Sequence, residues 1–203
     1  MGKVADNVFY SAISALKQTK KLSNKPEFLR VVQSVALASW KKQRIWTSGM
    51  GKAGLVAHKL ASTLSSNNIP AAYIHSGEAL HGDFGAIQKN DILIAFSNSG
   101  KTDEVSLVAD KAKSTEALLI LITGDNESKI ARKADIVLCY GKLQESCPLG
   151  LTPTTSISVM LVVADAIAME VQAANGLTYE QYSRNHHAGY LGQISLEKAR
   201  RKK

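Results

Sequence analysis

The amino-acid sequence predicts an α/β domain: a three-layer αβα sandwich with a five-stranded parallel sheet between helices, preceded by a helical extension. Length is the first indication, because 203 residues suit one domain and hardly leave room for two. Composition is the second, since 45% apolar and 21% charged residues are typical of a soluble chain that buries a core. The third is the alternation of five short apolar runs with amphipathic stretches, which is the pattern of βαβ units.

We expect a single domain over residues 1–203, made of a helical extension (1–42), an α/β core (43–192) and a basic tail (193–203). In the extension, apolar residues recur at helical spacing on both sides of Pro26, which suits the first turn of a second helix. The sequence contains no internal repeat and no low-complexity segment.

The core alternates strands with helices. β-branched and other apolar residues predict strands over residues 44–47, 71–75, 92–96, 118–123 and 136–140. Amphipathic spacing predicts helices over residues 53–64, 103–114, 127–133 and 156–174, the last ended by Asn175-Gly176. Short apolar strands separated by helices predict parallel pairing, with both faces of the sheet covered.

Charge is concentrated at one end of the chain. The net charge is +8, and five of the positive charges belong to the basic tail: Lys198, Arg200, Arg201, Lys202 and Lys203. A basic terminus is usually a solvated, frayed segment, and an aromatic content of 6% is low for a surface that stacks on bases. We therefore expect no nucleic-acid partner.

Cysteine content and hydropathy indicate a cytoplasmic protein. Cys139 and Cys147 form neither a CxxC pair nor a disulfide framework, which fits a reducing compartment. No apolar run reaches the roughly 18 residues that a membrane span needs. The N-terminus also lacks the apolar stretch of a signal peptide. We expect no membrane partner.

The first candidate binding loop is Ser48-Gly49-Met50-Gly51-Lys52-Ala53-Gly54, between a predicted strand and a predicted helix. It matches GxGxxG, but the next strand ends in His75 and Ser76 instead of the acid that holds a ribose. It is not a P-loop either, because Trp46 replaces the first glycine and Ala53 replaces the Ser or Thr after Lys52. Two alternatives remain: a tight turn alone, or a loop that presents Lys52 to an anionic or oxygen-rich ligand.

The second candidate loop is Ser97-Asn98-Ser99-Gly100-Lys101-Thr102-Asp103-Glu104. It places three hydroxyls around a glycine turn at the start of a helix, where free backbone N–H groups favour a phosphate. A plain N-cap would need one hydroxyl, and a monophosphate suits the loop better than ATP because no Walker pattern for Mg²⁺ accompanies it. A third loop, residues 150–156, adds hydroxyls at the start of the long helix.

We expect these loops, with the end of the second strand, to supply the phosphate- and substrate-binding residues Ser48, Gly49, Gly51, His75, Ser97, Asn98, Ser99, Thr102, Thr154 and Thr155.

Four of the five histidines lie in or beside these loops: His75, His81, His186 and His187. No HxH, HxxxH or HExxH spacing occurs, so we expect no metal; a zinc site on His81 and His186 is the alternative. Histidine and a tuned glutamate are suited to acid–base chemistry near pH 7.

Taken together, the motifs resemble the D-arabinose-5-phosphate isomerases of the sugar isomerase (SIS) superfamily, from about residue 44 to residue 192. The strings that carry the resemblance are GMGKAG (49–54), HSGEALHGD (75–83), SNSG (97–100), ESCPLGLTPTTS (145–156) and HHAGYLG (186–192). The resemblance implies the SIS fold, a homotetramer and no cofactor. It also implies interconversion of D-ribulose 5-phosphate and D-arabinose 5-phosphate, which supplies 3-deoxy-D-manno-octulosonate for lipopolysaccharide or capsule.

The same resemblance implies a set of catalytic residues: Lys52, His81, Glu104, Glu145 and His186. The chain departs from the family pattern at four positions, with Ser76 and His187 in place of proline, Lys101 in place of glutamate and Ala188 in place of a glycine. The family's pair of cystathionine-β-synthase-like regulatory domains is not expected in a chain that ends at Lys203.

Aldose–ketose isomerisation needs a base that moves a proton between neighbouring carbons through an enediol, and acids that serve the two oxygens. The sequence leaves the base open among His81, Glu104 and His186, while Lys52 could polarise the carbonyl or hold hydroxyls. Two alternative functions also stay open. The chain could isomerise another ketose phosphate, or it could be a non-enzymatic regulator that binds a sugar phosphate, although its first 43 residues contain no recognisable helix-turn-helix.

Overall fold

The computed structural model describes residues 2–187 and 189–201. In chain order its elements are α1 (Lys3–Thr19), η1 (Lys20–Asn24), α2 (Pro26–Trp40), β1 (Ile45–Gly49), α3 (Gly51–Ser66), β2 (Ala71–His75), η2 (Glu78–His81), η3 (Asp83–Ala86), β3 (Ile92–Phe96), α4 (Asp103–Ser114), β4 (Leu118–Thr123), β5 (Ile136–Cys139), α5 (Thr155–Asn175), α6 (Tyr179–Asn185) and α7 (Tyr190–Arg201). The three elements labelled η are 3₁₀ helices.

The five strands form one parallel sheet in the order β2-β1-β3-β4-β5. The five predicted strands are confirmed, and β2, β3 and β4 have the predicted bounds. β3 lies at the centre of the sheet and is buried along its whole length, as expected for a strand covered on both faces.

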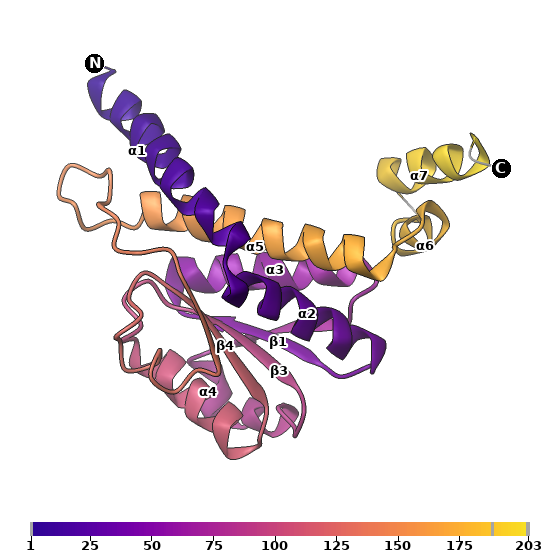
Figure 1. Cartoon of the computed structure of the whole chain (residues 1–203), viewed down its shortest axis with the longest axis horizontal. Helices are drawn as coiled ribbons and strands as arrows, with labels where there is room; N and C mark the ends of the chain where they lie inside the picture. The colour runs from indigo at the N-terminus through magenta and orange to yellow at the C-terminus, as the bar shows by residue number, and fades with distance from the viewer. Residues whose placement is uncertain (1, 188, 202–203) are drawn as a thin grey trace.

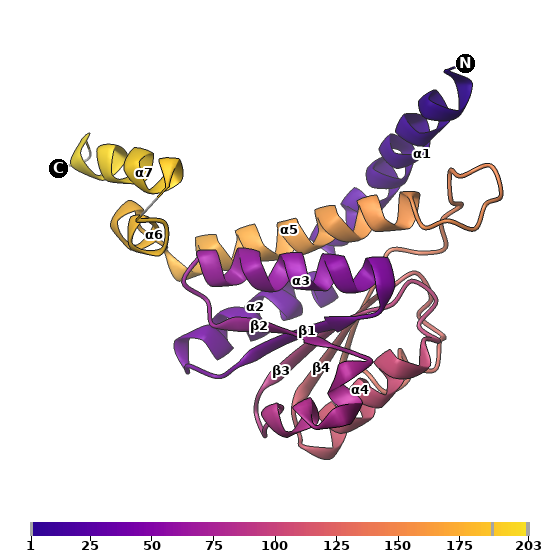
Figure 2. The same cartoon turned by 180° about the vertical axis from the view of Figure 1, so that it is seen from behind.

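Helices cover both faces of the sheet, which confirms the three-layer fold (Figures 1 and 2). Because side chains alternate along a strand, Ile94 and Phe96 of β3 join the core beneath α2, α3 and α5, while Leu93 and Ala95 join the core beneath α4. The helical extension belongs to the first of these layers, since α2 packs on the sheet and α1 packs along α5.

The long helix α5 is the centre of that layer and packs against α1, α2 and α3. It has 21 residues, nine of them buried, and by length and composition alone it could cross a membrane. The expectation that no stretch of the chain has this property is therefore wrong for α5. Core helices of soluble proteins pass the same test, and α5 is packed in the manner of a core helix.

The helix predicted over residues 127–133 is wrong, because this segment forms a series of turns. Side chains make local bonds to the backbone there: the Asp125 carboxylate accepts from the Glu127 N–H at 3.0 Å, and the Ser128 hydroxyl accepts from the Ala131 N–H at 3.3 Å. A helix over these residues would bond the Ala131 N–H to the Glu127 carbonyl. Such local bonds compete with a regular helix in a short segment.

The chain after α5 contains two helices that were not predicted. α6 and α7 lie beyond the C-terminal end of α5, while the N-terminal end of α1 projects at the opposite end of the molecule (Figures 1 and 2). The basic tail is therefore not frayed as far as Arg201, where α7 ends. Ala188, Lys202 and Lys203 lie outside the described residues.

Candidate active site

The parallel register brings the carboxyl ends of three strands together at one edge of the sheet. Gly49, the last residue of β1, pairs with His75 of β2 on one side and with Phe96 of β3 on the other. The chain leaves β1 into α3 on one face and leaves β3 into α4 on the other face (Figure 2). The point between β1 and β3 is thus the topological switch point, where open α/β sheets bind their ligands.

The loop after β1 is shaped by a close approach of α3 to the strand. A Cβ atom at Gly54 would lie 2.7 Å from the Gly49 carbonyl oxygen and 2.8 Å from the Tyr73 hydroxyl, so no side chain fits there. Tyr73 donates a hydrogen bond to the same carbonyl at 3.2 Å. Among the described residues, no side chain caps α3, and its first N–H groups are available to a ligand.

Ser48 points away from this loop. Its buried hydroxyl donates to the Ile74 carbonyl at 2.8 Å and lies 2.8 Å from the Ser76 hydroxyl. These contacts join β1 to the end of β2. The role of Ser48 in substrate binding stays a prediction.

The serine loop, residues 97–102, turns over the end of β3. The buried Ser97 shares a hydrogen bond of 3.1 Å with the Thr102 hydroxyl, so two of the three predicted phosphate ligands bond to each other. The exposed Ser99 hydroxyl accepts from the Lys101 N–H at 3.2 Å, which leaves its own proton free to donate. In the described part of the chain no side chain caps α4, so its first N–H groups also face outwards.

Two charged groups flank this point, one on each face of the sheet. Lys52 is exposed in the first turn of α3, and Glu104 is half-buried in the first turn of α4. His75 ends β2, and His81 follows this strand on the same edge. The His75 Nδ1 atom accepts from the Glu78 N–H at 3.3 Å, while His81 is exposed at the end of η2. The structure therefore brings Lys52, His75, His81 and Glu104 to one edge.

Glu145 occupies a different position, because its carboxylate caps α5. One oxygen accepts from the Thr154 N–H at 2.7 Å, from the Thr154 hydroxyl at 3.2 Å and from the Ser156 N–H at 3.2 Å; the other accepts from the Ser156 hydroxyl. Burial raises the pKa of Glu145, but the hydrogen bonds from Ser156 and Thr154 outweigh burial and leave the pKa below its ordinary value. The carboxylate is therefore ionised at neutral pH.

The other residues of this third loop are held in a similar way. The Thr154 hydroxyl accepts from the Ser146 N–H at 3.0 Å and lies 2.9 Å from the Ser146 hydroxyl, while Asn7 of α1 donates to the Ser146 carbonyl at 3.3 Å. Thr155 is buried, and its hydroxyl has no partner within the described ranges. The backbone N–H groups of Thr152 and Leu151 bond to the Cys147 sulfur and lower the pKa of its thiol to about 7.

His186 is not brought to this edge within one chain. It follows α6, where its ring stacks on Tyr182 with a centroid distance of 4.1 Å and its Nδ1 atom bonds to the Tyr182 carbonyl at 3.0 Å. α5 starts beside Glu145 and runs 21 residues before this segment, a length of roughly 30 Å at the usual helical rise. The two ends are far apart in both views (Figures 1 and 2).

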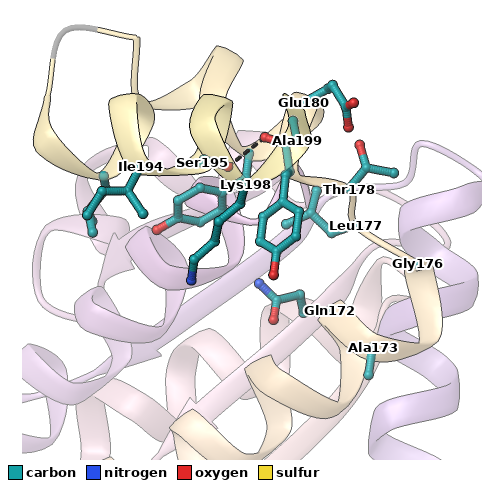
Figure 3. A pocket seen from close by; sticks show the side chains of 13 residues that line it. Gln172, Ala173, Gly176, Leu177, Thr178, Glu180, Ile194, Ser195, Lys198 and Ala199 are labelled. Carbon is teal, nitrogen blue, oxygen red and sulfur yellow. Dashed lines mark hydrogen bonds between the residues drawn. The ribbon is translucent and has the colours of Figure 1, made fainter. Parts of the chain in front are cut away.

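Two cavities matter for this assignment. One of about 320 Å³ lies beside the serine loop and is lined by Asn98, Ser99, Lys101, Gly124, Asp125, Lys142 and Leu143. A larger one of about 790 Å³ lies at the other end of α5, between that helix, α6 and α7 (Figure 3). None of the predicted site residues lines the larger cavity, although Tyr182, which stacks on His186, does.

Within residues 2–187 and 189–201, no three histidine, cysteine, aspartate or glutamate side chains gather where a metal ion could bind. The alternative zinc site on His81 and His186 has no support inside one chain, because these residues lie towards opposite ends of α5. The absence of a metal and of any other cofactor stays a prediction.

Two contacts at this edge were not predicted from the sequence. Ser156 bonds to Glu145 through both its N–H and its hydroxyl, and Tyr140 bonds to Asn98 from the end of β5. A tyrosine directly after an apolar strand was a visible signal for the second. The first could not be found, because the loop that returns Glu145 to α5 leaves no mark in local spacing.

Comparison with known proteins places the fold in a family. The family model described as the SIS domain matches residues 37–170, from the end of α2 to the last turns of α5. The arabinose 5-phosphate isomerase KdsD of Escherichia coli strain K12 is 42% identical over 157 residues, which are 77% of this chain and 48% of that protein. The chain thus spans about half the length of the curated relatives it matches.

Solved structures also resemble this chain over most of its length, among them the following two. A protein of Bacteroides fragilis, described as a candidate phosphosugar isomerase involved in capsule formation, is 36% identical with a TM-score of 0.80, covering 90% of this chain and 98% of its own. The c3406 protein of E. coli CFT073, solved in complex with A5P, is 29% identical with a TM-score of 0.79, covering 91% of this chain and 96% of its own.

The cap on α5 predicts how stability depends on pH. Replacing Glu145 by alanine should lower the free energy of unfolding by about 1–2 kcal/mol at pH 7, because the N–H groups of Thr154 and Ser156 at the start of α5 lose their acceptor. The folded-state pKa of Glu145 is below its ordinary value of 4.5, so its contribution is present above that pH and is lost as the pH falls through the folded-state pKa. Urea unfolding measures the difference in the free energy of unfolding between the wild type and Glu145→Ala. This difference should be smaller at pH 3 than at pH 7.

Glu170→Ala, an exposed position near the other end of the same helix, is the matched control and should change stability little at either pH. A Glu145→Ala effect of equal size at both pH values would contradict the cap.

Proposed function

This chain belongs to the SIS domain family, and we propose that it is an aldose–ketose isomerase that interconverts D-ribulose 5-phosphate and D-arabinose 5-phosphate. The proposal is supported by the identity with KdsD and by the likeness to a structure solved in complex with A5P. We take residues 1–203 as a single SIS domain.

One observation carries the proposal: the switch point between β1 and β3 combines two uncapped helix N-termini with a serine loop and charged side chains. Helix N-termini favour an anion through their free N–H groups and their dipole. A monophosphate on the serine loop would leave the sugar between Lys52, Glu104 and the two histidines at and after the end of β2. That is the arrangement an isomerase needs.

The reaction itself is a redistribution of protons. From the aldose, a base takes the proton on C2, an enediol forms between C1 and C2, and the proton returns to C1 while the hydroxyl proton moves from O2 to O1. We propose His81, Glu104 or His186 as the base and Lys52 as the group that polarises the carbonyl oxygen. We place Glu145 at the same site through its loop, and the binding residues are those of the serine loop, the β1 loop, His75, Thr154 and Thr155.

We further propose that the protein acts in the cytoplasm as a homotetramer. We also propose that its product is used to make 3-deoxy-D-manno-octulosonate for lipopolysaccharide or capsule. Exposed apolar side chains along α1 support assembly: Val4, Val8, Phe9, Tyr10 and Ile13. Apolar patches of this kind are usually covered by a partner.

The function is tested by incubating the purified protein with arabinose 5-phosphate in D₂O and following the sugar by NMR. Deuterium at C1 of ribulose 5-phosphate is expected, and the rate should survive exhaustive chelation. A panel of other ketose phosphates is run in parallel. Deuterium exchange with only one of these other sugars would show that this sugar is the substrate instead of arabinose 5-phosphate. Binding of a sugar phosphate without exchange would indicate a non-enzymatic regulator.

Ser99 supplies the next prediction, because its hydroxyl is exposed and free to donate to the phosphate. Ser99→Ala should raise KM roughly five- to thirtyfold, the equivalent of about 1–2 kcal/mol for one charged hydrogen bond, and should lower kcat less. Ser114→Ala, at the far end of α4, is the control and should leave both constants unchanged. An unchanged KM for Ser99→Ala would remove this residue from the phosphate site.

The position of His186 predicts an active site shared between subunits. His186 cannot reach the β1–β3 edge of its own chain across the length of α5, so a second copy must supply it if it is catalytic. His81→Ala and His186→Ala subunits, each inactive alone, should regain up to roughly a quarter of wild-type activity when mixed, because mixed pairs then contain one intact site.

Mixing is measured after partial unfolding and reassembly, with mass spectrometry to count mixed oligomers. Stable mixed oligomers without any activity would show that the site is not shared in this way.

A further inference from the structure

Asn98 stands at the meeting point of three strand ends, and its oxygen atoms are all used inside the protein. Its backbone carbonyl accepts from the Gly124 N–H at 3.0 Å and from the Thr123 hydroxyl at 3.3 Å, both at the end of β4. Its side-chain Oδ1 atom accepts from the Tyr140 hydroxyl at 2.7 Å. Within the described residues, no protein group bonds to the Nδ2 atom, so the two amide protons are the part of Asn98 that a ligand can use.

Tyr140 is held rigidly while it makes this bond. It follows β5, donates its N–H to the Thr123 carbonyl at 3.1 Å, and packs its ring in the core beneath α2 and α5, with 8% of its surface exposed. Burial raises the pKa of Tyr140 above its ordinary value of 10, and the nearby Glu145 and Cys139 raise it further. The hydroxyl therefore keeps its proton and can donate it.

The space around the amide is restricted as well. A Cβ atom at Gly124 would lie 2.9 Å from the Asn98 Oδ1 atom and 3.1 Å from its carbonyl oxygen, so a side chain there would displace Asn98. Asn98, Ser99 and Gly124 together line the cavity of about 320 Å³ beside the serine loop. The amide thus faces solvent at the loop while its oxygen faces the protein.

The direction of this amide matters because a phosphate offers hydrogen-bond acceptors. An amide that presents its NH₂ group attracts the anion, whereas the same amide turned over presents an oxygen that repels it. The Tyr140 hydroxyl lies behind the amide and favours the first orientation. A hydroxyl that donates its proton needs an acceptor, which the amide oxygen is and the NH₂ group is not.

We propose that Tyr140 is a positioning residue for phosphate binding, whose hydroxyl orients the Asn98 amide so that its NH₂ group donates to the anion at the serine loop. The inference rests on the proposed function only in taking that anion to be the phosphate of a sugar. It adds a residue at the end of β5 to a site built from the ends of β1, β2 and β3 and from the loop before α5.

The test is a double-mutant cycle of Tyr140→Phe, Asn98→Ala and the combined variant. Phenylalanine keeps the packed ring and removes only the hydroxyl. Tyr140→Phe should raise KM for arabinose 5-phosphate and the Kd for inorganic phosphate by roughly three- to tenfold, with kcat nearly unchanged. In the Asn98→Ala background the same substitution should change neither constant, because the group through which Tyr140 acts is gone.

Ser114→Ala, which removes an exposed hydroxyl at the far end of α4, is the control and should match the wild type. Thermal unfolding of every variant shows whether the fold is kept. An equal rise in KM with and without Asn98 would overturn the inference, and so would an unchanged phosphate Kd in Tyr140→Phe.

The two measurements separate this inference from the function on which it rests. If the wild type does not isomerise arabinose 5-phosphate, the proposed function fails, while titration of the serine-loop NMR signals with inorganic phosphate still decides the role of Tyr140. If the wild type isomerises its substrate and Tyr140→Phe binds phosphate equally well, the inference fails alone.

Discussion

The close approach of α3 to the end of β1 is the constraint on which the rest of the site depends. At Gly54 the helix backbone lies against the Gly49 carbonyl, at a distance that a single methyl group would prevent. This contact fixes where α3 begins, and therefore where Lys52 and the first N–H groups of the helix lie. The register of β1 with β2 and β3 then places His75 and the serine loop beside the end of β1.

The sequence was sufficient for the sheet because each strand is a short apolar run whose burial is visible in its composition. It was not sufficient for residues 127–133, where the Ser128 hydroxyl takes the Ala131 N–H that a helix would bond to the Glu127 carbonyl. It also gave no sign of α7, whose buried residues are the small Gly192, Ser195 and Ala199 and so leave no apolar stripe. Local patterns thus predict elements that bury large side chains and miss those that do not.

The same limit applies to the site. Hydroxyls at the strand ends indicated a ligand edge, but spacing could not show that Ser48 bonds to Ser76 or that Ser97 bonds to Thr102. Nor could it show that the Glu145 carboxylate lies on the N-terminus of α5. These contacts join residues from different turns and loops. They decide which predicted groups are free for a ligand and which hold the protein together.

The place of α5 in the chain has a consequence for how the protein is made. Synthesis from the N-terminus releases all five strands before α5, yet Val159, Val163, Ile167 and Val171 of this helix complete the core over one face of the sheet. A nascent chain that has not reached residue 175 therefore exposes an apolar sheet surface beside α2 and α3. Such exposed apolar surfaces favour aggregation. The nascent chain therefore stays prone to aggregation until α5 has left the ribosome and covered this face of the sheet.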